Sequence, residues 1–519
     1  MAFVQESLGL CRTMSTLTKI PGSFDQPHDA AKTETNVSAS QNAEGDPHLV
    51  VLEPEDNPQN MSLFRRWLAV LIISSASLCA AFTEQGVAQT FHVSHEVTVL
   101  GISLFVVGLG SGPLLVGPLS EVYGRNVVYQ ISYVLFFIFT FPVVFAPNIA
   151  VFLVFRLITG FCGSAFLSVA GGSVSDMFPD SSIASPMAVY TISPFIGPVA
   201  GPLIAGFINQ HLYWEWTYRV QLCWIFVEFL MLATFVPETY VPVILKKKAR
   251  RLRKSTGDPK FYAPLDRREG TLTSAILISC YKPFQLLLFD RMVLLLDSWN
   301  ALILGILYLA FQAFPIIFED IHGFNMQTTG LAFIGIGLGM LSAISTQPLW
   351  NRGVPFSLVF GIKSILMVLI SRLYARETAR YNGDPPPEVR LIMGQVGAIL
   401  VPVGLFCLAF TTYPQVHWIA PIIASVPFGS GIYFVFTSTF TYLVTAYRPI
   451  AATAMASDSA LRFAFAAVFP LFAGAMYDKL GTVGATALLA GLSTIMAPLP
   501  FIFYRIGARL RKNSRFAAH

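Results

Sequence analysis

The sequence is poor in charged side chains. Asp, Glu, Lys and Arg make up only 12% of its 519 residues, whereas soluble globular chains carry about 25%. Hydrophobic residues reach 54%, and the mean hydropathy is +0.61. This composition excludes an ordinary soluble domain and predicts a polytopic membrane protein. The net charge of +5 is modest and concentrated in particular loops, so it indicates topology and gives no support to a nucleic-acid partner.

Motifs for metal, nucleotide and catalytic chemistry are missing as well. The six cysteines are scattered, and no two form the CxxC spacing of metal or redox centres. No GxxxxGK[ST] loop is present to hold the phosphates of ATP. No set of nucleophile, histidine and acid residues forms a catalytic constellation. The sequence therefore predicts free thiols, no metal site, no bound cofactor and no enzymatic activity.

Residues 1–60 lack the apolar periodicity of a folded segment. They are rich in Ser, Thr, Asn, Asp, Glu and Pro, so they bury too little surface to offset the entropy lost on ordering. We expect a disordered cytoplasmic tail over this range. Because no basic start is followed by an apolar core, we expect no cleaved signal peptide.

Long apolar segments follow, each close to the roughly 20 residues that a helix needs to cross hydrocarbon. They predict an all-α protein with twelve transmembrane helices in two six-helix halves, 61–238 and 286–505. A basic cytoplasmic loop over 239–285 joins the halves, a further loop covers 351–390, and a basic tail covers 506–519. The predicted spans lie near 67–87, 97–117, 127–147, 150–174, 185–208, 218–236, 291–314, 328–349, 391–411, 418–442, 451–474 and 482–504.

Basic residues indicate which loops face the cytoplasm. Arg125 follows the second span, the central loop is basic from Lys246 to Arg268, and the last tail is basic from Arg505 to Arg515. Both termini are therefore predicted to be cytoplasmic. The alternate loops without Lys or Arg are Ala146–Ile149, Glu319–Gln327 and Thr411–Trp418.

One apolar segment, Val354–Ile370, does not fit this count. It is short, it contains Lys363, and as a thirteenth span it would place the basic C-terminus outside. We interpret it as an interfacial or intracellular helix, with an aberrant gene-model segment as the alternative.

An arginine, Arg156, lies inside the apolar segment Phe155–Phe178. A charge at the centre of a membrane helix costs roughly 2.5–3.5 kcal/mol on insertion scales, so Arg156 is expected to face the protein interior or a wet cavity. Asp458 and Arg462 are i,i+4 in the eleventh span and are expected to neutralise each other. The carboxylates in or near spans are Glu84, Asp176, Glu228, Asp297 and Asp458.

Three motifs in sequence order resemble those of the major facilitator superfamily. GPLSEVYGRN at 117–126 resembles its cytoplasmic signature loop, and RLITGFCGSA at 156–165 its fourth-helix signature. SPFIGPVAGPLIAGF at 193–207 resembles its fifth-helix antiporter signature. With VPETY at 236–240, the likeness extends to the fungal twelve-span drug:proton antiporters and covers about 60–515. It implies inverted three-helix repeats and two halves that rock about a central substrate site.

The resemblance implies a cytoplasmic gate after the second span. Glu121 and Arg125 are i,i+4 and would face each other, Gly124 would allow a tight backbone, and Asp176 could join them. An ion pair there can hold two helices together in one state and release them in the other. The alternative is a topogenic loop whose surface ion pair contributes little. In the second half, Thr445 stands where an acidic residue is expected.

The resemblance also implies that Arg156 takes part in proton coupling with a carboxylate, for which Glu84 is the candidate. The alternatives are an arginine fixed to backbone carbonyls and a merely interfacial Glu84. In the fifth helix, prolines remove backbone donors and glycines admit a neighbouring helix, an arrangement associated with antiporters. Generic helix packing is the alternative. The fifth-helix residues concerned are Gly197, Pro198, Gly201 and Pro202.

The function expected from this resemblance is proton-coupled export of amphipathic organic compounds, driven by the proton gradient alone. A polyamine exporter is the alternative, and a nutrient symporter or facilitator is less favoured. We expect a monomer in the plasma membrane, or alternatively the vacuolar membrane, whose partners are a small organic substrate, protons and lipid. Aromatic and polar residues of spans seven and ten are candidates for the substrate cavity, although many will be simple packing. They are Tyr308, Gln312, Tyr433, Phe434 and Tyr442.

Overall fold

A computed structural model describes residues 48–79, 91–179, 182, 184–267, 272–346, 386–447, 450–512 and 514. Within these ranges the regular secondary structure is helical, apart from one isolated β-bridge between Leu49 and Tyr262. Apolar segments form helices because lipid offers no partner to a backbone N–H or C=O, so each segment must satisfy its own groups. The predicted all-α membrane fold is confirmed.

The first half contains spanning helices close to the predicted positions. The second of them, α5, is longer than predicted and ends only at Gly124, whose φ of 104° suits glycine. The fourth span is divided into three consecutive helices, α7 to α9. The elements are α3 (Leu63–Cys79), α5 (His95–Tyr123), α6 (Arg125–Val144), α7 (Ile149–Gly163), α8 (Ala165–Ser168), α9 (Ala170–Met177), α10 (Ala184–His211) and α11 (Glu215–Phe235).

The second half begins with α14, which ends in a π-helical turn, η4. Its longest element, α21, consists of two helices joined across a kink at Gly481, where φ is 69°. In the described part of the chain, ten segments are long and apolar enough to span a membrane, and the last of them contains this kink. Two crossings in that segment, together with α3, agree with the predicted twelve. The elements are α14 (Arg291–Pro315), η4 (Ile316–Ile321), α15 (Met326–Ala332), α16 (Ile334–Ser345), η6 (Pro387–Arg390), α19 (Leu391–Thr411), α20 (Ile419–Ala446), α21 (Ala451–Met496) and α22 (Leu499–Lys512).

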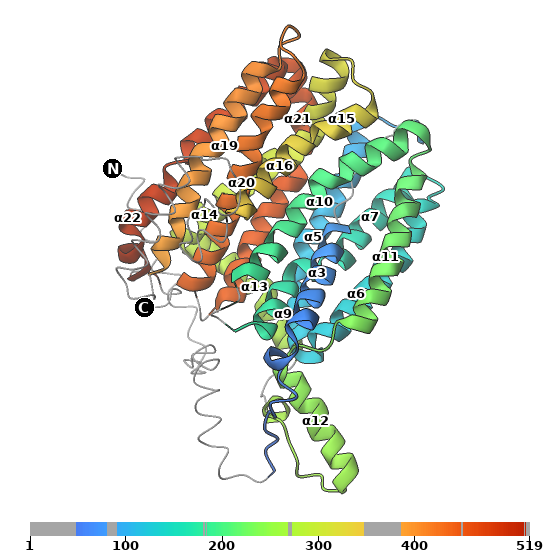
Figure 1. Ribbon diagram of the computed structural model, residues 1–519, viewed down its shortest axis with the longest axis vertical. Coiled ribbons are helices and arrows are strands. Elements are labelled where there is room, and N and C mark those ends of the chain that lie inside the picture. The colour runs from blue at the N-terminus through green and yellow to red at the C-terminus, as the bar shows by residue number, and fades with distance from the viewer. Residues whose placement is uncertain are drawn as a thin grey trace, which may run out of the picture. The chain divides into compact units, whose positions relative to one another are not determined.

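The connection between the halves contains two helices to which the sequence analysis assigns no structure. The basic helix α12 (Val241–Thr256) ends at Gly257 and extends beyond the end of α11 (Figure 1). The apolar helix α13 (Leu272–Phe289) packs against α5 of the first half and α21 of the second. Lys282 and Pro283 interrupt its apolar sequence, and for this reason the sequence analysis does not predict it as a transmembrane span. The end of the bundle that carries Arg125, α12 and the start of α14 is called the basic end below.

Residues 48–60, assigned to the disordered tail by sequence, pack on α12. Val50 donates a backbone hydrogen bond to the Tyr262 carbonyl at 3.0 Å, and Tyr262 donates one to the His48 carbonyl at 3.0 Å. The Lys248 ammonium lies 2.9 Å from Glu53 and 2.7 Å from Asp56. Partners nearly 200 positions away in sequence supply the burial that the segment itself lacks. Residues 1–47 and Val354–Ile370 lie outside the described residues.

Replacing Lys248 by Ala is expected to loosen this contact without affecting the bundle. Burial lowers the pKa of Lys248, but its hydrogen bonds to Asp56 and Glu53 raise that pKa more, so the net change is upward. An ion pair of this kind contributes about 1 kcal/mol or less, so hydrogen exchange at Val50 should accelerate up to about fivefold. Arg250→Ala, at an exposed position of the same helix, is the control. Equal exchange in Lys248→Ala and the wild type would contradict the contact.

Candidate functional site

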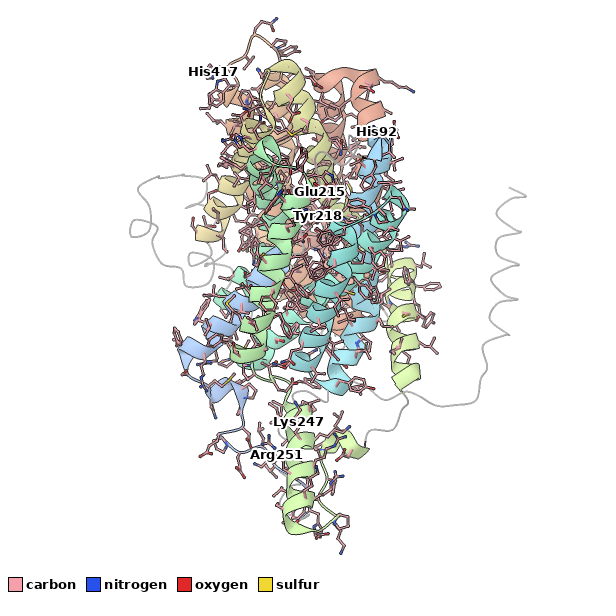
Figure 2. All side chains as sticks on the ribbon, turned by 90° about the vertical axis from the view of Figure 1, so that its right-hand side faces the viewer. His92, Glu215, Tyr218, Lys247, Arg251 and His417 are labelled. Atoms are coloured by element: carbon pink, nitrogen blue, oxygen red, sulfur yellow. The ribbon has the colours of Figure 1, made fainter. Side chains whose placement is uncertain are left out.

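Each half of the bundle buries an arginine among aromatic rings. Arg156, on α7, is only 2% exposed. Its guanidinium carbon lies 4.3 Å from the ring centre of Phe105 on α5 and 5.5 Å from that of Tyr218 on α11, which is labelled in Figure 2. A guanidinium over an aromatic face is stabilised by the ring quadrupole, most strongly where water is excluded. The structure therefore gives Arg156 an interior, aromatic environment.

Arg462, on α21, is the counterpart in the second half and is 6% exposed. One of its Nη atoms lies 3.5 Å from a carboxylate oxygen of Asp458, as the i,i+4 spacing predicts. Phe195 of α10 stacks on Phe436 of α20 with ring centres 4.3 Å apart, so the aromatic surroundings of Arg462 come from both halves. Its guanidinium carbon lies between 4.8 and 5.8 Å from the ring centres of Phe195, Phe436, Phe440 and Phe463.

Tyr308 on α14 is close enough to feel the charge of both arginines. Its phenol lies within electrostatic reach of both Arg156 and Arg462. Tyr308 also meets Phe311 edge to face at 5.4 Å, and Gln312 follows one turn later on the same helix. The bundle thus has a centre with two cationic groups, a phenol and several aromatic rings.

The other predicted cavity residues are buried in this structure. Tyr433 and Phe434, neighbours on α20, have ring centres 5.8 Å apart, and both side chains are almost fully covered. Their role as substrate contacts, like that of Tyr308 and Gln312, stays a prediction.

Tyr442 does not share a site with Tyr308, and this corrects its assignment to the same cavity. Its hydroxyl lies 3.0 Å from the sulfur of Met292, in the first turn of α14. Sixteen residues separate Met292 from Tyr308 on that helix, which corresponds to about 24 Å. Tyr442 therefore belongs to the packing of the basic end. The sequence held the signal for this, because Tyr442 is the last residue of the predicted span 418–442, at its cytoplasmic end, whereas Tyr308 lies toward the opposite end of the span 291–314.

The fifth-helix residues lie where the halves meet. Gly197, Pro198, Gly201 and Pro202 are all buried within the continuous helix α10. The closest approach is made by glycines outside that group. A Cβ on Gly330 of α15 would lie 2.5 Å from the Pro202 carbonyl, and one on Gly206 would lie 2.6 Å from the Met326 carbonyl. The spacing of α10 and α15 therefore depends on glycine at both helices.

At the basic end, Arg125 meets Asp176 and does not meet Glu121. Its Nε lies 3.4 Å from Asp176, and one Nη donates a hydrogen bond to the Ser120 hydroxyl at 2.6 Å. Glu121 is half-buried on the last turn of α5. The predicted Glu121–Arg125 pair fails because Gly124, with φ of 104° and ψ of 157°, breaks the helix between them. The i,i+4 rule holds only within a continuous helix.

Glu238, and not the predicted Glu121, is the glutamate that contacts Arg125. The Arg125 backbone N–H donates to its Oε1 at 2.8 Å, and the N–H groups of Thr239 and Tyr240 donate to the same oxygen at 3.1 Å. The Arg125 guanidinium also lies 4.8 Å from the Tyr240 ring centre. The sequence signal was present, because Glu238 belongs to the VPETY motif after the sixth span, but no role was assigned to it.

Gly124→Ala is expected to destabilise this corner. A Cβ there would lie within van der Waals overlap of the Glu238 carboxylate, and the backbone occupies a region that is open essentially only to glycine. We expect a loss of about 1–3 kcal/mol, measured as reduced thermal stability in detergent. Gly257→Ala is the matched control, because it also has positive φ, at 71°, but meets nothing within 4 Å. An equal loss of thermal stability in the two variants would show that the contact with Glu238 does not contribute to the effect.

The second half has a different polar cluster at the basic end. Asp290 caps α14, and the Tyr447 hydroxyl donates to it at 2.9 Å. Burial, together with the charge of Asp290, raises the pKa of Tyr447 well above its usual value, so this hydroxyl stays a donor. Nearby, Arg511 on α22 pairs with Glu388 at 3.1 Å. These contacts join the start of α14 to the end of α20, and α22 to η6. They form although position 445, where an acidic residue was expected, is Thr445.

Glu84, the predicted proton-coupling carboxylate, lies outside the described residues. Arg156 is therefore the residue of the predicted coupling pair whose surroundings are known.

The fold and the buried centre define a membrane transporter made of two helical halves. The family model for the Major Facilitator Superfamily matches residues 67–463, and the chain belongs to this family. The predicted family and the multi-pass membrane architecture are thereby confirmed.

Fungal relatives are similar over nearly the whole chain. The efflux pump atB of Aspergillus terreus is 42% identical over 490 residues, covering 94% of this chain and 91% of the pump. The probable drug/proton antiporter YHK8 of Saccharomyces cerevisiae is 40% identical over 476 residues, covering 90% of this chain and 88% of the relative. The multidrug transporter mdrA of Aspergillus fumigatus is 34% identical, with 92% and 77% covered.

Solved structures share the fold at low identity. The human organic anion transporter MFSD10 superposes with a TM-score of 0.58 at 16% identity, over 85% of this chain and all of that one. The proton:xylose symporter XylE gives a TM-score of 0.56 at 15% identity, over 86% and 94%. At such identity the likeness defines the fold alone.

Proposed function

We propose that this protein is a proton-coupled efflux transporter that exports amphipathic organic compounds by alternating access. The observation that carries the proposal is the buried centre, in which Arg156, Arg462 and Tyr308 lie among aromatic rings contributed by both halves. The fungal relatives named as efflux pumps and as a drug/proton antiporter support the same function. Transport, and not enzymatic catalysis, is the activity.

The proton gradient supplies enough free energy for such export without a bound cofactor. A proton moving inward down one pH unit gains about 1.4 kcal/mol. Movement down 100 mV adds roughly 2.3 kcal/mol. Together they sustain a gradient on the order of several hundredfold for a neutral substrate exchanged one for one.

The centre favours planar aromatic substrates over polyamines. The rings of Phe105 and Tyr218 lie against Arg156, and those of Phe195 and Phe436 lie against Arg462. A planar organic molecule can stack on such rings, whereas a flexible polyamine has no ring with which to do so. A polyamine exporter is therefore the second candidate, and a nutrient symporter the third.

The basic end is proposed to face the cytoplasm, with both termini on that side. Lys247 and Arg251 of α12 lie at this end, and His92 and His417 lie at the opposite end (Figure 2). Basic residues are retained on the cytoplasmic side during insertion, which supports this orientation. We propose a monomer in the plasma membrane, surrounded by lipid, with the vacuolar membrane as the alternative.

An efflux assay tests the function in cells. Yeast lacking their own drug pumps and expressing this protein are loaded with rhodamine 6G, and loss of fluorescence is followed after washing. We expect faster efflux than in cells carrying the empty vector, and a protonophore should abolish the difference. Faster efflux that survives the protonophore would contradict coupling to protons. The same cells tested for spermine and glucose export separate the two alternative functions.

A further inference from the structure

A second polar cluster lies between α14 and α21, and it contains two carboxylates but one guanidinium. Its members are almost completely buried, and Asp297 and Asp458 are both 0% exposed. Asp297 and Asn300 are i,i+3 on α14, so they share a face. The residues that meet there are Asp297, Asn300, Ser457, Asp458 and Arg462.

The hydrogen bonds and the positive charge in this cluster go mainly to Asp458. Its Oδ1 accepts a hydrogen bond from the Asn300 amide at 2.7 Å, and its Oδ2 lies 3.5 Å from Arg462. Asp297 receives only the Ser457 hydroxyl, which donates to its Oδ2 at 2.9 Å. Its Oδ1 is buried and has no hydrogen-bond partner among the described residues. The two carboxylates are therefore in different situations although they share one site.

Other charged groups around α14 do not compensate Asp297. Asp290, seven residues earlier and about 10 Å along the helix, is negative as well. Tyr442 of α20 contacts Met292 in the first turn of α14, and Tyr447, just after α20, contacts the cap residue Asp290. Both are neutral phenols. From α22, Arg511 is paired with Glu388. On α13, Lys282 is exposed.

A carboxylate that is buried without a paired cation loses its hydration and gains little in return. Binding a proton removes the charge and also creates an O–H donor for a neighbouring acceptor. A group in this position is neutral in one state and can ionise when its surroundings open to water. These are the properties that a proton-carrying site requires.

We propose that Asp297 carries the proton that is exchanged for substrate, an assignment that rests on the proposed function. A proton arriving from outside forms an O–H bond with the Asp297 carboxylate. When the state that opens to the basic end is reached, that bond breaks, and the proton leaves to the cytoplasm with the carboxylate restored. No oxidant, reductant or further reactant is needed.

Arg462 connects this step to the movement of the halves. It pairs with Asp458, and its guanidinium also lies beside Phe195 of the first half and Phe436 of the second. When Asp297 ionises, the cluster holds two negative charges, and Arg462 is drawn toward both. Its displacement changes the aromatic contact between α10 and α20, which is a contact between the halves.

Infrared spectroscopy of the purified protein tests the protonation of Asp297 without any substrate. A protonated carboxylic acid absorbs apart from carboxylates, and its band shifts in D₂O. We expect the difference between wild type and Asp297→Asn at neutral pH to contain one such band. Asp478→Asn, the same change at an exposed position of α21, should show none. A wild-type minus Asp297→Asn difference without a carboxylic acid band would overturn the proposal.

Transport in proteoliposomes tests the coupling role, with rhodamine 6G as the probe. Asp297→Asn should still exchange internal for external rhodamine at equal pH, since exchange needs no net proton movement. Its accumulation ratio under a pH gradient is expected to fall to about one, because the gradient no longer drives the cycle. Asp297→Glu, which keeps a protonatable group, should restore part of the accumulation, and a merely structural role would not give this pattern.

Failure of the Asp297 assignment and failure of the proposed function give different transport results. If Asp297→Asn accumulates rhodamine as the wild type does, the assignment of Asp297 is wrong and proton-coupled export stands. If the wild type exchanges rhodamine but never accumulates it under a gradient, the proposed function is wrong, and the role of Asp297 in exchange is lost with it.

Discussion

Replacing Arg156 by Ala is expected to reduce gradient-driven transport on the order of a hundredfold, the equivalent of about 2.7 kcal/mol. The substitution removes a charged group that the first half contributes to the arrangement of Arg156, Arg462 and Tyr308, and it leaves Phe105 and Tyr218 facing a void. The initial rate of rhodamine 6G accumulation in proteoliposomes measures the effect.

Two further variants separate the charge of Arg156 from its shape. Arg156→Lys keeps the charge but loses the planar group that lies on the Phe105 ring, so we expect an intermediate rate. Arg219→Ala is the control, because Arg219 also lies over an aromatic ring, that of Trp216 at 4.9 Å, but is less buried on the same helix as Tyr218. Wild-type transport by Arg156→Ala would show that this centre does not carry the function.

The second large effect is expected for the Asp458–Arg462 pair. Asp458→Ala leaves the Arg462 guanidinium buried without its carboxylate, and breaking a buried pair in this way costs about 3–5 kcal/mol. The double substitution to Ala at both positions removes the unpaired charge, so it should be less destabilising than the sum of the two single changes. Thermal unfolding in detergent at constant pH gives the three values for a double-mutant cycle.

Additive effects would contradict this account of the pair. The cluster offers an internal check, because Asn300→Ala removes only the neutral donor to Asp458 and should cost about 1 kcal/mol. A cost for Asn300→Ala equal to that for Asp458→Ala would mean that shape, and not charge, dominates at this position.

The spans were predictable because their length and hydropathy are set by the bilayer. α19, for example, runs from Leu391 to Thr411 as predicted. The contact of residues 48–60 with α12 was not predictable, because it depends on pairing of Lys248 with residues far away in sequence. Periodicity reports which face of a segment is apolar, and it carries no information on which distant segment covers it.

The candidate site was predictable only in part, for reasons that particular residues show. A single charge in an apolar run identifies Arg156 as an interior residue from sequence alone. The Glu121–Arg125 pair was wrong because one glycine with positive φ changes the direction of the next side chain. The inequality between Asp297 and Asp458 was invisible in the sequence, since it arises from which carboxylate Asn300 and Arg462 contact across two helices.

The central claim, proton-coupled export, is tested most directly by the pH inside proteoliposomes. Vesicles with an acidic lumen and a trapped pH-sensitive dye contain wild-type protein, Arg156→Ala or no protein, and hydrophobic drugs, spermine or glucose are added outside. The account predicts that a drug raises the luminal pH faster with the wild type than with the other two, since protons leave as the drug enters. Drug entry without any such proton movement, or a response to glucose alone, would contradict it.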